Sequence, residues 1–199
     1  MPYTYIFCSK ICSYQEKDVI LHFDMELTDT HIIYSVLTPK MLKNLLQLQE
    51  EAFAHISDES LLRRNSEAMF LECLQPPHTT LGAFLDNKLI AIAILYNPLH
   101  HPEEALSPLL QTINGNKYEA ANFKLCIVHP DYRGIHLQQI LGKQLETYAI
   151  QQHISLLCST ASHNNYHSIH NLLAIGYQFD HALTKYSFNR NLYYKLLSK

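Results

Sequence analysis

The chain has 199 residues, of which 47% are hydrophobic, and carries a formal net charge of −3 with only 15 lysines and arginines. This length and apolar content suffice for one sizeable core, and the few basic residues argue against a nucleic-acid-binding surface. No apolar run is long enough to span a membrane, and the first ten residues lack the features of a secretory signal. We therefore expect a cytoplasmic protein that binds neither nucleic acid nor membrane.

The first residues of the chain predict a β-rich extension. Residues 3–27 alternate loosely between apolar and polar side chains, as two or three strands would. We therefore expect an N-terminal β extension over residues 1–30, whose role the sequence does not define, and one domain over residues 31–199.

A strand and two helices follow. The segment "HIIYSVL" (31–37) predicts a short strand, and Thr38 with Pro39 predicts the start of a helix. One face of this helix would carry the apolar side chains Leu42, Leu45, Leu46, Phe53 and Ile56. A second helix is expected from near Asp58 to Cys73, ended by the two prolines that follow.

Residues 79–96 predict two strands joined as a hairpin, with the turn at Asn87 and Lys88. The long connection after them, 97–122, contains three prolines and an Asn-Gly pair. Connections of this length are typical of functional covers or mobile insertions. A short helix could begin in this one at Pro102.

The second half of the chain predicts a parallel strand pair. Residues 123–128 and 154–161 each contain a continuous apolar run, as strands buried on both faces do. The helix between them begins after Gly134, and a strand–helix–strand unit of this length implies parallel strands with a right-handed crossover. A helix at 165–175 and two further strands close the chain, so the order of elements predicts a mixed α/β fold.

The five cysteines are odd in number and scattered, which predicts reduced, mostly buried thiols. Cys8 and Cys12 have a spacing that could begin a metal site, but no matching pair follows them. His163, His167 and His170 fall on one helical face, yet no acidic residue lies near them. We therefore predict no metal site.

The corner between the strand at 123–128 and the helix after it has the features of an anion site. A helix that begins directly after a buried strand directs free backbone N–H groups, and the positive end of its dipole, at one place. Arg133 adds a positive charge there, and Gly134 lets the backbone approach a ligand closely. A phosphate or pyrophosphate would suit this corner; a plain β-to-α turn is the alternative interpretation.

These residues resemble the signature of the GNAT family of acyl-CoA N-acyltransferases, in which a strand ending in valine leads through a Pro-x-Tyr-Arg-Gly turn into a helix. The matching residues of this first block are Val128, Pro130, Tyr132, Arg133 and Gly134. A second block typical of the family follows the next strand and matches at Asn165, Ser168, Gly176 and Tyr177. The two blocks together carry the resemblance, which is specific over residues 125–177.

The resemblance implies a GNAT-like fold: a mostly antiparallel central sheet with one splayed parallel strand pair and helices on both faces. It also implies acetyl-CoA as acyl donor, with its pantetheine arm in the gap between the splayed strands. The main chain of Cys126, Ile127 and Val128 would bind this arm. The pyrophosphate would lie on the N–H groups of Arg133, Gly134, Ile135, His136, Leu137 and Gln138, with Asn165 and Ser168 on the far wall.

Two positions depart from the family pattern. His136 replaces a usual glycine, and we expect it to take a helical φ, as L-residues readily do. A backbone N–H in a helix donates whatever side chain its residue carries. We therefore expect His136 to weaken or shift the cofactor without excluding it. Leu172 stands where many members carry a tyrosine that protonates the departing thiolate. The strand holds no general base, and action through water by Glu103 or Glu104 stays open, so we assign no catalytic residue.

The resemblance therefore predicts an acyl-CoA-dependent N-acyltransferase that acetylates a primary amine by direct attack. The acceptor would be a small molecule or a peptide, and the protein a monomer or homodimer. The alternative is a catalytically degenerate binding or scaffold protein with the same fold, a hypothesis motivated by His136 and Leu172. A purely structural α/β domain that binds no coenzyme A is a third alternative.

Overall fold

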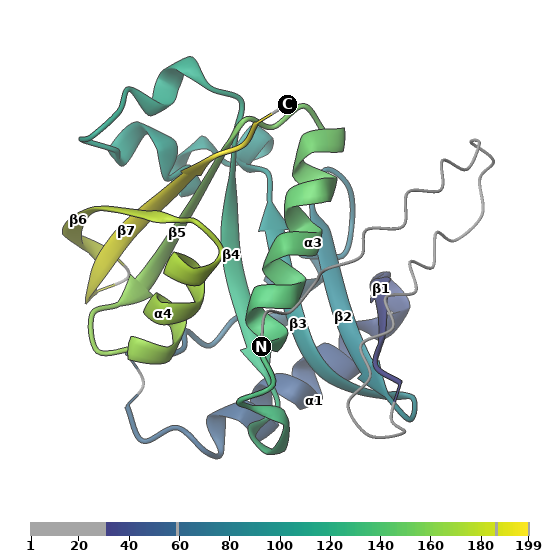
Figure 1. Ribbon diagram of the computed structural model, residues 1–199. Helices are drawn as coiled ribbons and strands as arrows, with labels where there is room; N and C mark the ends of the chain where they lie inside the picture. The colour runs from purple at the N-terminus through teal and green to yellow at the C-terminus, as the bar shows by residue number, and fades with distance from the viewer. Residues whose placement is uncertain (1–30, 59, 186, 199) are drawn as a thin grey trace, which may run out of the picture.

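The computed structural model describes residues 31–58, 60–185 and 187–198 (Figure 1). The extension predicted at 1–30, with Cys8 and Cys12, lies outside these residues. The described chain forms one seven-stranded sheet in the order β1-β2-β3-β4-β5-β7-β6. Its strands are β1 Ile33–Val36, β2 Thr79–Leu85, β3 Lys88–Tyr96, β4 Ala120–Val128, β5 Leu156–Ser162, β6 Gln178–Lys185 and β7 Phe188–Leu196.

In the described ranges four α-helices cover both faces of the sheet, as predicted. α3 (Leu137–Gln151) and α4 (Tyr166–Ala174) lie on the near face in Figure 1, and α1 (Leu42–Phe53) lies behind the sheet. α2 (Glu67–Cys73) packs with α1 in the hydrophobic cluster of that second face. No helix in the described ranges is both long and apolar enough to cross a membrane.

The predicted parallel strand pair is confirmed, but it is short. β4 and β5 are parallel, and all other neighbouring strands are antiparallel. The pairing covers only Ala120 to Asn122 of β4, and the last pair joins Asn122 to Cys158 of β5. Beyond that point β4 continues to Val128, paired with β3, and β5 continues to Ser162, paired with β7, but the two strands no longer pair with each other. We call this divergence of β4 and β5 the fork.

The second predicted helix is much shorter than expected, because residues 60–66 form a loop and α2 begins only at Glu67. The Ser66 side chain accepts a hydrogen bond from the N–H of Met69 (3.2 Å), so it caps α2 at that point. The side-chain oxygen of buried Gln49 accepts from the N–H of Asn65 (2.8 Å), and its amide donates to the Asn65 carbonyl (3.0 Å). This exchange fixes the end of the loop against α1.

Two further expectations are corrected at turns. The hairpin turn is at Asp86 and Asn87, with φ of 50° and 65°, and β3 begins at Lys88. Two successive positive φ values are typical of a tight two-residue hairpin turn, and Asn and Asp tolerate them. Of the short helix expected from Pro102, only the 3-10 turn Pro102–Glu104 forms, and the described chain over 97–119 holds only such three-residue turns. Its prolines remove backbone donors that a continuous helix needs.

The long connection is tied down by one buried carboxylate, Asp180 of β6. Its two oxygens accept hydrogen bonds from the N–H groups of Gln111 (3.0 Å) and Thr112 (2.8 Å), and His181 Nδ1 lies 2.5 Å away. The side chain has 0% exposure. Burial alone would raise the pKa of Asp180, but these hydrogen bonds outweigh it and lower the pKa from 3.8 to about 2.

Replacing Asp180 by Asn should therefore lower the free energy of unfolding at pH 7 by about 2 kcal/mol, measured by urea denaturation. Because the folded pKa is depressed, this contribution is complete above the unfolded value near 4 and is lost as the pH falls towards 2. The difference between the wild type and Asp180→Asn should shrink over that range. Asp86→Asn, at an exposed turn position, is the matched control and should change stability little.

Candidate functional site

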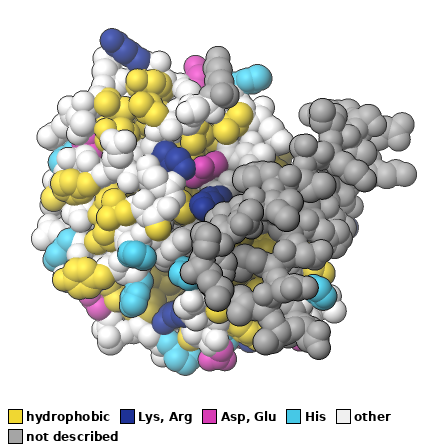
Figure 2. All heavy atoms as spheres, viewed as in Figure 1, with side chains coloured by type: hydrophobic (Ala, Val, Ile, Leu, Met, Phe, Trp, Pro, Cys, Tyr) yellow, Lys and Arg dark blue, Asp and Glu magenta, His cyan; other side chains and the backbone are white. Residues whose placement is uncertain are grey.

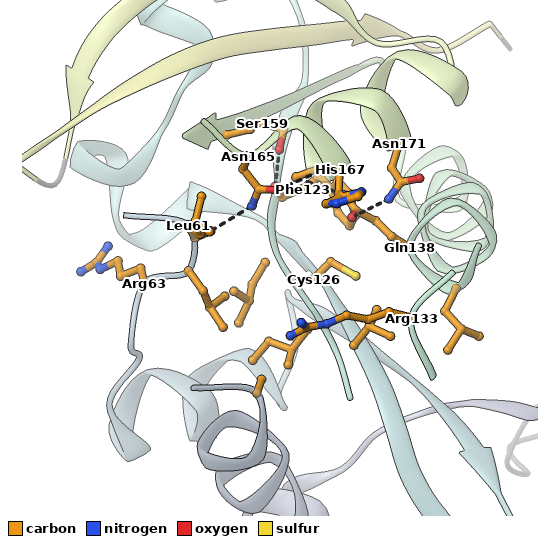
Figure 3. A pocket seen from close by; sticks show the side chains of 18 of the residues that line it. Leu61, Arg63, Phe123, Cys126, Arg133, Gln138, Ser159, Asn165, His167 and Asn171 are labelled. Atoms are coloured by element: carbon orange, nitrogen blue, oxygen red, sulfur yellow. Dashed lines mark hydrogen bonds between the residues drawn. The ribbon is translucent and has the colours of Figure 1, made fainter. Parts of the chain in front are cut away.

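A cavity of about 570 Å³ opens at the fork. Residues 122–128 of β4 and 159–161 of β5 form its walls (Figure 3). The turn before α3 and the first turns of α4 line it on one face of the sheet, and the loop after α1 lines it on the other. Its size and mixed lining are typical of a small-molecule site.

The fork leaves one edge of β4 without a β5 partner. Ser159, which is buried, donates its hydroxyl to the Phe123 carbonyl (2.9 Å) just beyond the last strand pair. From Cys126 to Val128 the backbone is paired with β3 only. Cys126 points into the middle of the cavity (Figure 3). An extended ligand could lie here and pair with the β4 backbone, as a strand would.

The turn into α3 directs several donors at the cavity. Among the described residues, none accepts a hydrogen bond from the N–H groups of His136, Leu137 and Gln138, which open the helix. The Arg133 guanidinium, from an exposed residue, makes no hydrogen bond or ion pair with a described residue and extends towards the cavity in Figure 3. Gly134, with φ of 88°, has no atom within 4 Å of a Cβ built on it. These groups together suit a phosphate or pyrophosphate.

The expectation of a helical φ for His136 is wrong. His136 is the residue before α3 and has φ of 62° and ψ of 19°, in the left-handed region. Its side chain makes no capping bond. Glycine reaches this conformation at no steric cost, whereas a residue with a Cβ is destabilised by about 1–2 kcal/mol. The turn itself therefore favours glycine at this position.

We expect His136→Gly to be more stable than His136→Ala by about 1 kcal/mol, because only the alanine keeps the unfavourable φ. Lys143, exposed in the interior of α3, supplies the control. At Lys143 the order should reverse, with glycine less stable than alanine by about 1 kcal/mol. Urea denaturation of the four variants measures both differences; the same order at both sites would refute the left-handed turn.

Side-chain amides hold α4 against the start of α3. Gln138 donates to the Ser168 hydroxyl (3.3 Å) and accepts from the amide of Asn171 (3.1 Å), and Gln139 donates to Asn171 (2.8 Å). Figure 3 shows Gln138 and Asn171 facing each other across this seam. We call these three bonds the amide ladder; they fix the width of this end of the cavity.

Asn165 connects the two sides of the site. Its side-chain oxygen accepts from the N–H of Ser168 (3.0 Å), which caps α4, and its amide donates to the Leu61 carbonyl (3.1 Å) in the loop after α1. The hydroxyls of Ser60 and Ser162 form a second link from that loop to β5 (3.2 Å). The loop is thus fastened over the second face of the fork.

The structure brings together all but one of the residues predicted for the cofactor. The predicted residues that line the cavity are Cys126, Ile127, Val128, Arg133, Gly134, His136, Leu137, Gln138, Asn165 and Ser168. Ile135 does not line it and instead packs against the hydrophobic core beneath α3. Ile127 and Leu137 are each 2% exposed, so only their backbone can serve a ligand.

The base of the fork holds a charged residue that sequence analysis missed, Lys124. The β3–β4 register shifts here, so Lys124 has no partner on β3 and forms a bulge. Its ammonium lies 3.1 Å from the Glu104 carboxylate and 3.8 Å from the centre of the Tyr96 ring. Glu103 is directed away, towards His101 (3.0 Å). Glu103 and Glu104 were the two carboxylates that the sequence left as candidate general bases. Of these two, only Glu104 contacts a residue that lines the cavity, Lys124.

Leu172 is 1% exposed and belongs to the core beneath α4. Leu172 does not line the cavity, so its side chain would not face a ligand bound there. Arg190 of β7 lines the other end of the cavity and donates to the hydroxyl and the carbonyl of Thr160 (3.0 and 3.1 Å). Arg190 and the loop residues around Leu61 carry no sequence signal for this site, because long-range packing brings them there.

Comparisons with known proteins agree with this geometry. The model of the Acetyltransferase (GNAT) family matches residues 42–177. The ribosomal-protein-S18-alanine N-acetyltransferase from Escherichia coli is similar in structure, with a TM-score of 0.63 at 16% identity over 84% of this chain and 95% of its own. A GNAT-family acetyltransferase from Streptococcus pneumoniae gives a TM-score of 0.63 at 14% identity, over 84% of this chain and 100% of its own.

A Salmonella typhimurium protein, described as an acetyltransferase and solved with its cofactor acetyl-CoA, also gives a TM-score of 0.63, at 12% identity over 84% of this chain and 95% of its own. At these identities the likeness shows the fold. No curated protein matches the chain in sequence.

Proposed function

This chain belongs to the GNAT family of acetyltransferases, and from that membership we propose that it is an acyl-CoA-dependent N-acyltransferase that transfers an acetyl group from acetyl-CoA to a primary amine. The observation that carries the proposal is the cavity at the fork, which joins an unpaired edge of β4 to the free N–H groups before and in the first turn of α3.

The residues present fit the parts of acetyl-CoA. The unpaired backbone of Cys126, Ile127 and Val128 suits the amides of the pantetheine arm, which is an extended chain. The N–H groups of residues 136–138, with Arg133, suit the pyrophosphate. Gly134 leaves open space beside them. Asn165 serves this site by fixing α4 and the loop after α1.

Direct attack fits the groups that face the cavity. Acetyl-CoA supplies a thioester; the neutral amine attacks its carbonyl carbon, the C–S bond breaks to release the coenzyme A thiolate, and the amine loses one proton to water. Burial raises the pKa of the Cys126 thiol to about 12, so this thiol is not an available nucleophile at neutral pH. With buried Leu172 in place of an acid, the thiolate leaves unassisted, and positioning of the two reactants supplies the catalysis.

The acceptor would enter from the face opposite the donor. α3 and α4 line the donor side, so the loop after α1 and the base of the fork at Lys124 are left for the amine. The acceptor is an amine-bearing small molecule or peptide. The name of the E. coli neighbour, an alanine N-acetyltransferase of ribosomal protein S18, shows that proteins of this fold act on such amines.

The test is release of coenzyme A thiol from acetyl-CoA in the presence of amino acids, peptides, polyamines and aromatic amines. We expect thiol release that depends on both acetyl-CoA and one class of amine, with the acetylated amine identified by mass spectrometry. Tight binding of acetyl-CoA without turnover on any amine would instead support a degenerate binding protein.

A further inference from the structure

The first turns of α4 place two histidines in the cavity that the function proposed above does not use. His167 and His170 line the same cavity as Arg133 and His136, and the bonds of Gln138 to Ser168 and Asn171 bring their helix against the start of α3. Both are exposed, and neither makes a hydrogen bond or ion pair with a described residue. Figure 2 shows histidine side chains at the surface over α4, and Figure 3 shows His167 beside Gln138.

This end of the cavity is suited to anions. Every charged side chain among the described lining residues is basic, and no described aspartate or glutamate lines the cavity. The described residues contain no group of histidine, cysteine or acidic side chains that could hold a metal ion. The two histidines therefore face a site for negative charge, not for a cation.

The spacing between the two helices is fixed. The amide ladder holds the first turn of α3, with its free N–H groups, at a set distance from the face of α4 that carries His167 and His170. The cavity thus offers two separate groups of anion donors, one on each helix. Acyl-CoA carries two separate anionic centres: the pyrophosphate and the 3′-phosphate on its ribose.

We propose that His167 and His170 bind the 3′-phosphate of the acyl-CoA donor while the N–H groups at the start of α3 bind its pyrophosphate. This inference rests on the proposed function, because it names further ligands of the same donor. A neutral imidazole donates one N–H to the phosphate, and an imidazolium donates two and adds a full positive charge. The histidines thereby select acyl-CoA over donors that lack the 3′-phosphate.

The residues that surround the two histidines are basic or neutral. Arg133 and His136 face the two histidines from the turn before α3, together with the neutral amides of the ladder. At the far end of α4, Lys195 and Glu146 form an ion pair, so their charges cancel each other there. A phosphomonoester is largely dianionic at neutral pH, so the 3′-phosphate brings more negative charge to these residues than a 3′-hydroxyl does.

The test is isothermal titration with coenzyme A and with dephospho-coenzyme A, which carries a 3′-hydroxyl. The wild type should bind coenzyme A about 10-fold more tightly than the dephospho form. The double variant His167→Gln/His170→Gln should reduce this ratio to about 2-fold or less, with unchanged affinity for the dephospho form. His100→Gln/His101→Gln, outside this cavity, is the control and should keep the wild-type ratio.

Each other outcome identifies the failure. Equal wild-type affinity for the two ligands overturns the role of the histidines and leaves the proposed function standing. Equal loss of affinity for both ligands in the double variant, with unchanged thermal stability, also overturns it, because the histidines would then act on the site as a whole. Binding of neither ligand by the wild type overturns the proposed function itself.

Discussion

Replacing Cys126 by phenylalanine should weaken acetyl-CoA binding by about 100-fold or more and abolish turnover. Cys126 points into the middle of the cavity at the point where β4 has lost its β5 neighbour (Figure 3). A phenyl ring there would occupy the space that the pantetheine arm must cross, and interiors packed at protein density do not yield to such bulk. Isothermal titration with acetyl-CoA measures the loss, and circular dichroism confirms that the variant is folded.

Cys126→Ala is the matched control. It removes the thiol and adds no bulk, so binding and turnover should stay within about 3-fold of the wild type, since a thiol with a pKa of about 12 takes no part in direct transfer. Normal acetyl-CoA affinity in the folded phenylalanine variant would show that the arm does not lie in the fork. Loss of turnover in the alanine variant, with binding retained, would point to an acyl-cysteine intermediate and contradict direct attack.

Arg133→Ala should weaken acetyl-CoA binding about 10- to 100-fold, the range expected for loss of charge-assisted hydrogen bonds to a phosphate. The guanidinium extends towards the cavity and has no described partner in the protein, so its removal should leave thermal stability unchanged. In a turnover assay the KM for acetyl-CoA should rise while kcat at saturation changes little, because the contact is the same before and during the reaction.

Arg64→Ala is the control for Arg133→Ala. Arg64 is also exposed, pairs with Glu50 and does not line the cavity. Its removal should leave acetyl-CoA affinity unchanged. An Arg133→Ala variant that binds as tightly as Arg64→Ala would show that the donor's phosphates lie elsewhere.

The elements that set the fork were predictable because their signals are local. Continuous apolar runs at 123–128 and 154–161, with a helix-length connection between them, indicate buried parallel strands. The anion corner followed from Arg133, Gly134 and the start of the helix. The splay itself came from the family resemblance, since no local pattern tells where two parallel strands stop pairing.

The acceptor side of the site could not be predicted because long-range contacts build it. The contact of Ser60 with Ser162 spans 102 positions, and that of Leu61 with Asn165 spans 104. These contacts and the Ser66 cap keep residues 54–58 and 60–66 out of a helix, where a second helix was expected from near Asp58. The Lys124 bulge likewise depends on the β3–β4 register, which a single strand's sequence does not specify.

His136 shows the limit of reasoning from helix geometry alone. The expectation of a helical φ assumed that the helix had already begun at this position. The structure instead has positive φ at both Gly134 and His136, so α3 begins only at Leu137. The family's usual glycine at this position was the available signal, because glycine is favoured where a turn needs a left-handed residue.

The central claim, that the fork and the turn before α3 bind acyl-CoA, is tested most directly by thermal unfolding with increasing acetyl-CoA, coenzyme A or ATP. A ligand that binds only the native state stabilises it by about 2.7 kcal/mol at a hundredfold excess over Kd. We expect acetyl-CoA and coenzyme A to raise the unfolding temperature and ATP, which lacks the pantetheine arm, to raise it far less. No shift with millimolar acetyl-CoA, or an equal shift with ATP, would contradict the account.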